Sequence, residues 1–263
     1  MRRLKYVLLI IGILIIDALV FEPYSLNVTT YNLENQQLSG IKIVFATDFH
    51  IAPYPWEKMR LQKIINRINE QNADLVILGG DYVNRHDKKS TMSPDEIATK
   101  LKGIIAPKVA VLGNHDAYYG KSEVKTALKN VGISVLDNQN VSLILRRRHV
   151  SIAGVADYNT GKPRVEEVLK NLSKPIIFIT HSPDVFPNIL GRVDIAFAGH
   201  THGGQIVIPL LGALLVPTDS GRKYVYGLMY ENGKPLVISS GLGTSILPLR
   251  FYNRPEIVVV KFR

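Results

Sequence analysis

Five short polar motifs, each at the end of an apolar run, restrict the fold of this chain more than any other feature. The runs are short, continuous and rich in β-branched residues, as in strands that are buried on both faces. The motifs are Asp48-Phe49-His50, Gly80-Asp81, Gly113-Asn114-His115-Asp116, Thr180-His181 and Gly199-His200-Thr201-His202. Because ligands of open α/β sheets collect beyond the carboxyl ends of the strands, we expect the motifs to meet at one sheet edge.

Helical patterns alternate with strand patterns in the first half of the chain. Apolar residues recur at helical spacing within 56–70, Pro94 with two acidic residues opens a second helix, and 121–130 reads as a third. The second half has one helical pattern, at 163–172. The strand patterns lie at 26–30, 41–46, 75–78, 109–112, 133–136, 141–145, 150–155, 176–180, 195–198, 206–208, 224–230, 235–239 and 256–262. This order predicts an α/β fold with parallel pairings, as a single domain over residues 41–263.

The N-terminus has a different pattern. An apolar run begins at Tyr6 after three basic residues and continues to Phe21 with one break, at Asp17. The run approaches the roughly 20 apolar residues that a membrane-spanning helix needs. No cleavage site of small residues follows it. We predict an uncleaved membrane-anchor helix at 1–21 and a connecting segment at 22–40; a cleaved signal peptide or a buried first helix are the alternatives.

The composition narrows the chemistry. The 263 residues are 46% apolar, enough for one large core, and 32 Lys and Arg against 22 Asp and Glu give a net charge of +10. This excess favours a phosphorylated substrate, an anionic membrane surface or nucleic acid. No nucleic-acid partner is expected, because no spacing typical of nucleic-acid-binding modules is present. The absence of cysteine excludes disulfides, cysteine-ligated metals and thiol catalysis.

The side chains of the five motifs favour a metal site. Asp, Asn and His supply oxygen and imidazole ligands, which suit manganese, iron and zinc. A single Asp or His at a strand end is more often a turn cap, but five such motifs in order are hard to explain in this way. His200 and His202 lie on one side of an extended segment, and His181 ends an apolar strand, where an unliganded imidazole would need another polar partner.

Together these motifs resemble the calcineurin-like metallophosphoesterase superfamily, over about residues 41–263. The C-terminal segments look like a membrane-associated bacterial branch that includes UDP-2,3-diacylglucosamine pyrophosphatases. The segments that carry the branch resemblance are Gly203-Gly204-Gln205, Ser240-Gly241-Leu242-Gly243-Thr244-Ser245, Arg250-Phe251 and Pro255-Glu256-Ile257. The resemblance implies a four-layer α/β/β/α sandwich with mixed sheets.

The resemblance also implies two metal sites that share one carboxylate. The ligands of the first metal would be Asp48, His50, Asp81 and His202, and those of the second Asp81, Asn114, His181 and His200. We expect Mn²⁺, with Fe²⁺ or Zn²⁺ as alternatives. Two cations about 3.5–4 Å apart can activate water and hold phosphoryl oxygens for in-line attack.

Further roles follow from neighbours of the expected ligands. His115 would be the general acid at the leaving-group oxygen, and Asp116 would orient its imidazole or be a solvated turn acid. Asn84, Arg85 and Arg250 are candidate substrate contacts, with a solvated basic loop as the alternative for Arg85.

An apolar stretch follows the last motif. The segment Ile206–Pro217 contains two prolines and a glycine, which argue against a regular helix. It could shelter acyl chains or enter the edge of a bilayer; packing as part of the second sheet is the alternative.

We therefore predict a dinuclear metal-dependent phosphoester or pyrophosphate hydrolase at the bacterial inner membrane. A phosphorylated lipid or nucleotide-linked lipid is the expected substrate class. The lead candidate is UDP-2,3-diacylglucosamine, hydrolysed to lipid X and UMP in lipid A biosynthesis. A broad-specificity envelope phosphodiesterase and a non-catalytic binding scaffold are the alternatives.

The side of the membrane stays open. Basic residues before the helix (Arg2, Arg3, Lys5) would be retained inside, which places the domain outside, away from cytosolic UDP-sugars. A helix that lies in the cytoplasmic interface would remove the conflict.

Overall fold

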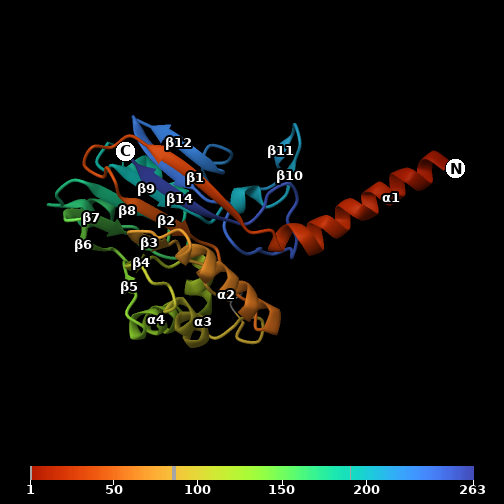
Figure 1. Ribbon diagram of the computed structural model, residues 1–263, viewed down its shortest axis with the longest axis horizontal. Coiled ribbons are helices and arrows are strands. Elements are labelled where there is room, and N and C mark those ends of the chain that lie inside the picture. The colour runs from red at the N-terminus through yellow and green to blue at the C-terminus, as the bar shows by residue number, and fades with distance from the viewer. Residues whose placement is uncertain (1, 85–86, 190) are drawn as a thin grey trace.

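Two six-stranded sheets pack face to face in the computed structural model, which describes residues 2–84, 87–189 and 191–263 (Figure 1). The first sheet has, in order, β1 (Asn27–Leu33), β14 (Glu256–Phe262), β2 (Lys42–Ala46), β3 (Leu75–Leu78), β4 (Lys108–Ala110) and β5 (Ser134–Val135). The second has β12 (Gly227–Glu231), β13 (Lys234–Ile238), β9 (Ile195–Ala198), β8 (Ile176–Ile179), β7 (Arg148–Gly154) and β6 (Gln139–Leu145).

Both sheets are mixed, with a parallel centre. Strands β2, β3, β4 and β5 are parallel, and β14 runs antiparallel to β2. In the second sheet β7, β8, β9 and β13 are parallel, and the edge strands β6 and β12 are antiparallel to their neighbours. The parallel strands of each sheet therefore end at a common edge.

The alternation of side chains along β2 explains the layers. Ile43 and Phe45 belong to the core between the two sheets, and Val44 and Ala46 to the core under the helices. Those helices are α2 (Pro55–Asn69), α3 (Pro94–Leu101) and α4 (Asn114–Asn130). The outer face of the second sheet packs against α5 (Val165–Leu169) and a 3₁₀ turn, Pro183–Asn188. The predicted α/β/β/α sandwich is confirmed.

Helix α4 begins earlier than the sequence predicts. It starts at Asn114 rather than 121 and bends at Gly120, whose φ is 152°. The sequence reads as a loop there because polar and glycine residues dominate. The Asp116 carboxylate satisfies the backbone N–H of Gly113, which caps the helix start.

The N-terminal helix projects away from the sandwich, as Figure 1 shows. Helix α1 (Arg2–Ile16) continues through a π-helical segment, Asp17–Phe21, into a 3₁₀ turn, Glu22–Tyr24. The helical segment Arg3–Tyr24 has the length and the apolar composition of a helix that can cross a membrane. Many signal sequences have the same properties. Nearly all of their side chains are exposed.

The segment predicted as a connector, 22–40, belongs to the folded domain. Strand β1 pairs along its whole length with β14, and Leu38 is buried. The base of the helix is also attached to the domain by hydrogen bonds. The backbone N–H of Arg250 donates to the Ala18 carbonyl at 3.0 Å, and the Glu22 carboxylate accepts from the backbone N–H groups of Tyr252 and Asn253. The domain therefore starts before residue 41.

The apolar stretch 206–217 does not join the second sheet. It forms a separate hairpin of β10 (Val207–Ile208) and β11 (Gly212–Ala213). Figure 1 shows this hairpin standing beside the base of α1. The packing alternative for this stretch is therefore wrong.

Candidate metal centre

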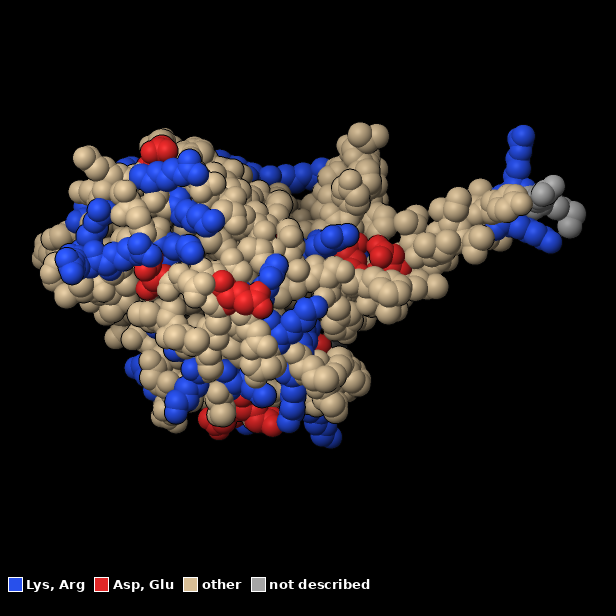
Figure 2. All heavy atoms as spheres, in the orientation of Figure 1, with Lys and Arg blue, Asp and Glu red and all other residues tan. Residues whose placement is uncertain are grey.

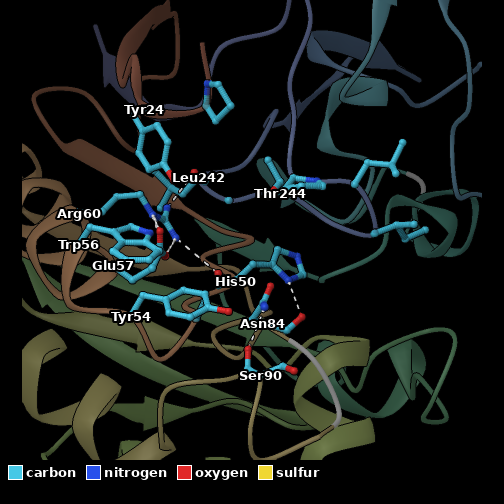
Figure 3. Close-up of a pocket in the computed structure, with 16 residues that line it drawn as sticks. Tyr24, His50, Tyr54, Trp56, Glu57, Arg60, Asn84, Ser90, Leu242 and Thr244 are labelled. Carbon is cyan, nitrogen blue, oxygen red and sulfur yellow. Dashed lines mark hydrogen bonds and ion pairs between the residues drawn. The ribbon is translucent and has the colours of Figure 1, made fainter. Parts of the chain in front are cut away.

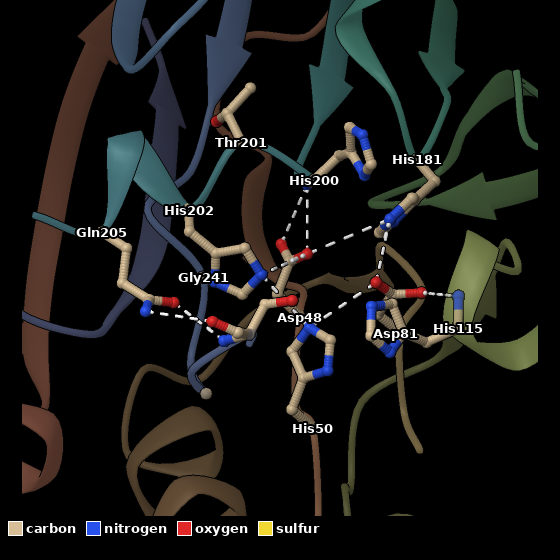
Figure 4. A network of polar contacts seen from close by, with 12 residues as sticks. Asp48, His50, Asp81, His115, His181, His200, Thr201, His202, Gln205 and Gly241 are labelled. Carbon is tan, nitrogen blue, oxygen red and sulfur yellow. Dashed lines mark hydrogen bonds and ion pairs between the residues drawn. The ribbon is translucent and has the colours of Figure 1, made fainter. Parts of the chain in front are cut away.

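The five polar motifs meet at the carboxyl edge of the two sheets. Asp48 follows β2, Asp81 follows β3, Asn114 begins α4 after β4, His181 follows β8, and the His200 motif follows β9. Figure 4 shows their side chains pointing toward one another from both sheets. All seven residues predicted as metal ligands are buried at this edge: Asp48, His50, Asp81, Asn114, His181, His200 and His202.

One group of donor atoms surrounds the Nε2 atoms of His50 and His202, which are 3.1 Å apart. His50 Nε2 is 3.5 Å from Asp81 Oδ2, and His202 Nε2 is 3.6 Å from Asp48 Oδ1. These are the four residues that the resemblance assigns to the first metal. Two imidazole nitrogens and two carboxylates that face one another so closely fit a shared cation.

A second group surrounds His181. Its Nε2 is 3.2 Å from Asn114 Oδ1 and 3.3 Å from Asp81 Oδ2. Asp81 Oδ2 therefore faces both groups, as a bridging carboxylate would. The His200 ring lies beside this group, 5.1 Å from the His181 ring between centroids, with its Nε2 at 3.1 Å from the Asn159 amide.

Backbone carbonyls fix the orientation of three imidazoles. His181 Nδ1 lies 2.8 Å from the Gly79 carbonyl, and the Asn84 carbonyl faces Nδ1 of His115 at 2.9 Å and of His50 at 3.4 Å. A carbonyl can only accept, so each Nδ1 carries its proton and Nε2 faces the site. Within the described residues, His202 Nδ1 has no hydrogen-bond partner.

The charges of the buried cluster also fit a divalent cation. Burial, reinforced by Asp81, raises the pKa of Asp48 to about 6, despite the lowering effect of His181. Burial lowers the pKa of His50 to about 3, against the attraction of Asp81, so its imidazole is neutral at pH 7. A neutral imidazole has a lone pair for a metal, and a cation would relieve the repulsion between the carboxylates.

The backbone at the site is strained. Five of the predicted ligands have left-handed backbones, with φ from 44° at His50 to 71° at His200; the other three are Asp48, Asp81 and His202. Non-glycine residues rarely adopt this region, and such strain concentrates at functional sites. The backbone of Gly113 packs directly against the Asp81 carboxylate. A Cβ at this position would lie 2.1 Å from Asp81 Oδ1, so only glycine fits there.

His115 lies at the open side of the centre. Its backbone N–H donates to Asp81 Oδ1 at 2.8 Å, and its ring meets the His50 ring edge-on at 4.6 Å between centroids. It is partly exposed, unlike the predicted ligands. A donor atom of His115 also lies within 4.8 Å of donor atoms of His50 and Asp81, so the geometry allows both a proton-transfer role and a ligand role.

Asp116 has neither of the two predicted roles. It is fully buried, and its carboxylate accepts backbone N–H groups of Asp81, Tyr82 and Gly113 at 2.9 Å and of Val83 at 3.3 Å. The His115 imidazole is oriented by the Asn84 carbonyl instead. Asp116 therefore links the Asp81 turn to the turn at Gly113 that begins α4.

The three predicted substrate contacts fare differently. Arg85 lies outside the described residues. Asn84 lines the cavity beside the site, but its side-chain amide donates to the Ser90 carbonyl at 2.9 Å. Arg250 is fully buried, and its guanidinium donates to backbone carbonyls rather than facing the cavity; the acceptors are Ser240, Gly241, Gly243 and Asn253. The prediction that Arg250 contacts the substrate is therefore wrong.

We expect Arg250→Met to destabilise the fold rather than weaken substrate binding. The substitution leaves several buried carbonyls without donors, each worth about 1–3 kcal/mol. Thermal unfolding of the full chain in detergent should show a lower midpoint than the wild type, whereas Arg254→Met, at an exposed arginine nearby, should not. An unchanged midpoint with a raised KM would restore Arg250 as a substrate contact.

A cavity of about 390 Å³ opens beside His50 (Figure 3). Tyr54 and Trp56 stack on each other at its wall, 4.6 Å apart between ring centroids, and Ile246 and Leu247 form an apolar part of the lining. Sequence reasoning missed these residues. The available signal was an aromatic pair at the start of an amphipathic helix, a few residues after the Asp48-Phe49-His50 motif.

The sequence comparison decides the family. Residues 41–204 match the profile of the calcineurin-like phosphoesterases. The chain belongs to this family. Membership, with buried Asp and His groups fit for a divalent metal, makes the protein a metal-dependent phosphohydrolase.

Relatives in the family extend over nearly the whole chain. The metallophosphoesterase YkuE of Bacillus subtilis is 30% identical, over 90% of this chain and 86% of its own length. A metallophosphoesterase of Aquifex aeolicus is 31% identical, over 92% and 94%. The phosphodiesterase YaeI of Escherichia coli is 30% identical, over 84% and 81%.

A solved structure agrees with the fold. TT1561 of Thermus thermophilus superimposes with a TM-score of 0.53 at 16% identity, over 78% of this chain and 91% of that chain.

Proposed function

We propose that this phosphoesterase is a membrane-anchored hydrolase of lipid-linked phosphodiesters or pyrophosphates, with UDP-2,3-diacylglucosamine as the lead substrate. One observation carries the proposal: the cavity beside His50 is also lined by Pro23 and Tyr24, at the end of the apolar N-terminal helix. A site at the foot of a membrane helix is suited to a substrate whose phosphate lies at the bilayer surface.

The residues of the centre would divide the chemistry between them. Asp48, His50, Asp81 and His202 would hold one divalent cation, and Asp81, Asn114, His181 and His200 the other. When bound, the cations supply Lewis acidity and an activated water. His115 Nε2 would give a proton to the leaving-group oxygen, because its Nδ1 is committed to the Asn84 carbonyl.

The cavity offers complementary surfaces for an amphipathic substrate. The Tyr54–Trp56 stack presents an aromatic face that a nucleobase or sugar can cover. Ile246 and Leu247 lie on the same lining and suit the start of an acyl chain. The net charge of +10 favours a phosphorylated partner at an anionic membrane.

A broad-specificity phosphodiesterase of the bacterial envelope is the second candidate. The name of the E. coli relative, a phosphodiesterase, favours it. So do the basic residues at the N-terminal end of α1, which would keep the N-terminus in the cytoplasm and the domain outside the inner membrane. The lead substrate requires the helix to lie in the cytoplasmic interface instead.

A substrate panel tests the proposal. The full chain in detergent micelles, supplied separately with Mn²⁺, Fe²⁺ or Zn²⁺, is assayed with UDP-2,3-diacylglucosamine and with a water-soluble aryl phosphodiester. We expect kcat/KM for the lipid nucleotide to be higher by about 100-fold or more, since its remote groups supply binding energy. Equal, slow turnover of both would reject the lipid nucleotide and favour the broad phosphodiesterase.

A further inference from the structure

We propose that the metal-site end of the domain docks directly on the lipid bilayer, through the exposed leucines of the β10–β11 hairpin and the neighbouring Ile246–Leu247 turn. The inference extends the proposed function, because it takes α1 as a membrane anchor. It assigns the domain a second, independent membrane contact that turns the mouth of the cavity toward the lipid.

The hairpin is apolar where solvent would favour polar residues. Leu210 is 107% exposed and Leu215 is 82% exposed. No charged residue occurs from Gly203 to Thr218. Burying a leucine side chain is worth about 1.5–3 kcal/mol, so several leucines held out of the core are a large unused source of binding free energy.

Two exposed aliphatic residues of the proposed docking surface, Leu210 and Ile246, have backbone conformations that are unfavourable for their residue types. Leu210 has φ 72° and Ile246 has φ 62°, the left-handed region in which glycine and asparagine are the favourable residues. The Ile246 side chain is 85% exposed. Neither packing nor turn geometry explains an aliphatic side chain at these positions, whereas insertion into a bilayer does.

The hairpin is continuous with the anchor. The Val207 N–H donates to the Phe251 carbonyl at 2.9 Å, and the Arg250 N–H donates to the Ala18 carbonyl of the helix base at 3.0 Å. An apolar groove between these elements is lined by Leu14, Ala18, Ile206 and Phe251, among others. Because α1 and the hairpin are joined in this way, a bilayer that takes up α1, across its width or at its surface, lies within reach of the hairpin (Figure 1).

The charge distribution fits an interface. Figure 2 shows the α1 rod without charged side chains between its basic tip and the acidic groups at its base, and the hairpin beside it is free of charged side chains as well. Behind the hairpin, the exposed Arg222 donates to the Leu211 carbonyl at 3.3 Å, which places a cation where lipid phosphates would lie. The half-exposed Tyr24 and Trp56 at the cavity have the amphipathic side chains typical of the interfacial region.

The cavity mouth belongs to the same face. Ile246 and Leu247 line the cavity that contains His50, and the hairpin connects directly to the motif that ends at His202. Docking would therefore seal the rim of the cavity against lipid, so that a headgroup phosphate could reach the metal centre while its acyl chains stay in the bilayer.

Trp56 makes the test direct, because it is the single tryptophan of the chain. The full chain is reconstituted into vesicles of phosphatidylcholine and phosphatidylglycerol that carry bromine on the acyl chains near the headgroup. We expect the Trp56 fluorescence to be quenched relative to unbrominated vesicles. The double variant Leu210→Asp, Leu215→Asp should lose most of this quenching while it still floats with the vesicles.

Ile144→Asp is the matched control. Ile144 is an equally apolar, 67% exposed residue on β6, at the edge of the second sheet far from α1 (Figure 1). This variant should retain wild-type quenching. Hydrolysis of a soluble aryl phosphodiester in micelles should be unchanged in the double variant, which shows that the site has folded.

Two results would overturn the docking surface. The first is vesicle-bound protein with unquenched Trp56, or equal quenching in the double variant. The second is a dimer in detergent that dissociates in the double variant, without quenching in vesicles; the leucines would then be covered by a second copy of the chain. Neither measurement depends on turnover, so loss of the proposed substrate would leave this test intact.

Discussion

Asp81→Ala is expected to remove both metal ions and to lower kcat/KM about 10⁴-fold or more. Its Oδ2 faces His50 on one side and His181 on the other, and its Oδ1 accepts the backbone N–H of His115. Loss of this one carboxylate therefore opens both groups of ligands. Metal ions supply several kcal/mol of transition-state stabilisation, and each 1.36 kcal/mol is about tenfold in rate.

Elemental analysis of the purified full chain measures this effect beside the kinetics. The wild type should retain two equivalents of divalent metal after gel filtration and Asp81→Ala should retain almost none. Asp219→Ala, which removes an exposed carboxylate distant in sequence from the ligands, should match the wild type. Two equivalents in the Asp81 variant would contradict the shared-carboxylate arrangement.

His115→Ala is expected to lower kcat about 10²–10⁴-fold with the metal content unchanged. His115 Nδ1 is held by the Asn84 carbonyl, so that Nε2 is the atom available to a leaving group. The loss should be larger for an alkyl phosphodiester than for a nitrophenyl phosphodiester, because a nitrophenolate leaves without a proton. His149→Ala, at an exposed histidine, is the control and should have wild-type rates.

Metal analysis separates the two roles that the geometry of His115 allows. If His115 is a ligand beside His50 and Asp81, the alanine variant should lose metal and activity together, for every leaving group alike. If it transfers a proton, the metal content stays constant and the loss depends on the leaving group. Undiminished turnover of all diesters would exclude both roles.

The layers of the fold could be predicted from the sequence because buried strands have a simple pattern. The run Leu75–Leu78 is apolar at every position and is a strand with these bounds, buried on both faces. The polar motif after each apolar run also predicted the position of the metal centre, because parallel strands end at one edge of their sheet. Patterns of this kind report burial directly.

Other features depend on contacts that no local pattern contains. Asp116 looks like a turn acid in the sequence, but its carboxylate accepts the backbone N–H groups of the Asp81 turn, 35 residues away along the chain. Arg250 looks like a free cation, but carbonyls of the 240–243 turn surround it. The left-handed backbones of five predicted ligands could not be predicted either, because only a few per cent of non-glycine residues adopt this region and no local pattern marks which ones do.

The junction between helix and domain has a mechanical consequence. Glu22 follows directly on the apolar run that ends at Phe21. Its carboxylate accepts from the Asn253 backbone, and the Asn253 side chain donates to the carbonyl of His202 at 2.6 Å. Two residues thus connect the base of the helix to the loop that carries His202, a predicted metal ligand. A protein on a slack tether would tumble and meet lipids at random angles. With α1 as the anchor that we propose, the tilt of the helix would set the orientation of the metal centre relative to the bilayer, and the protein would find its substrate by lateral diffusion in the membrane plane.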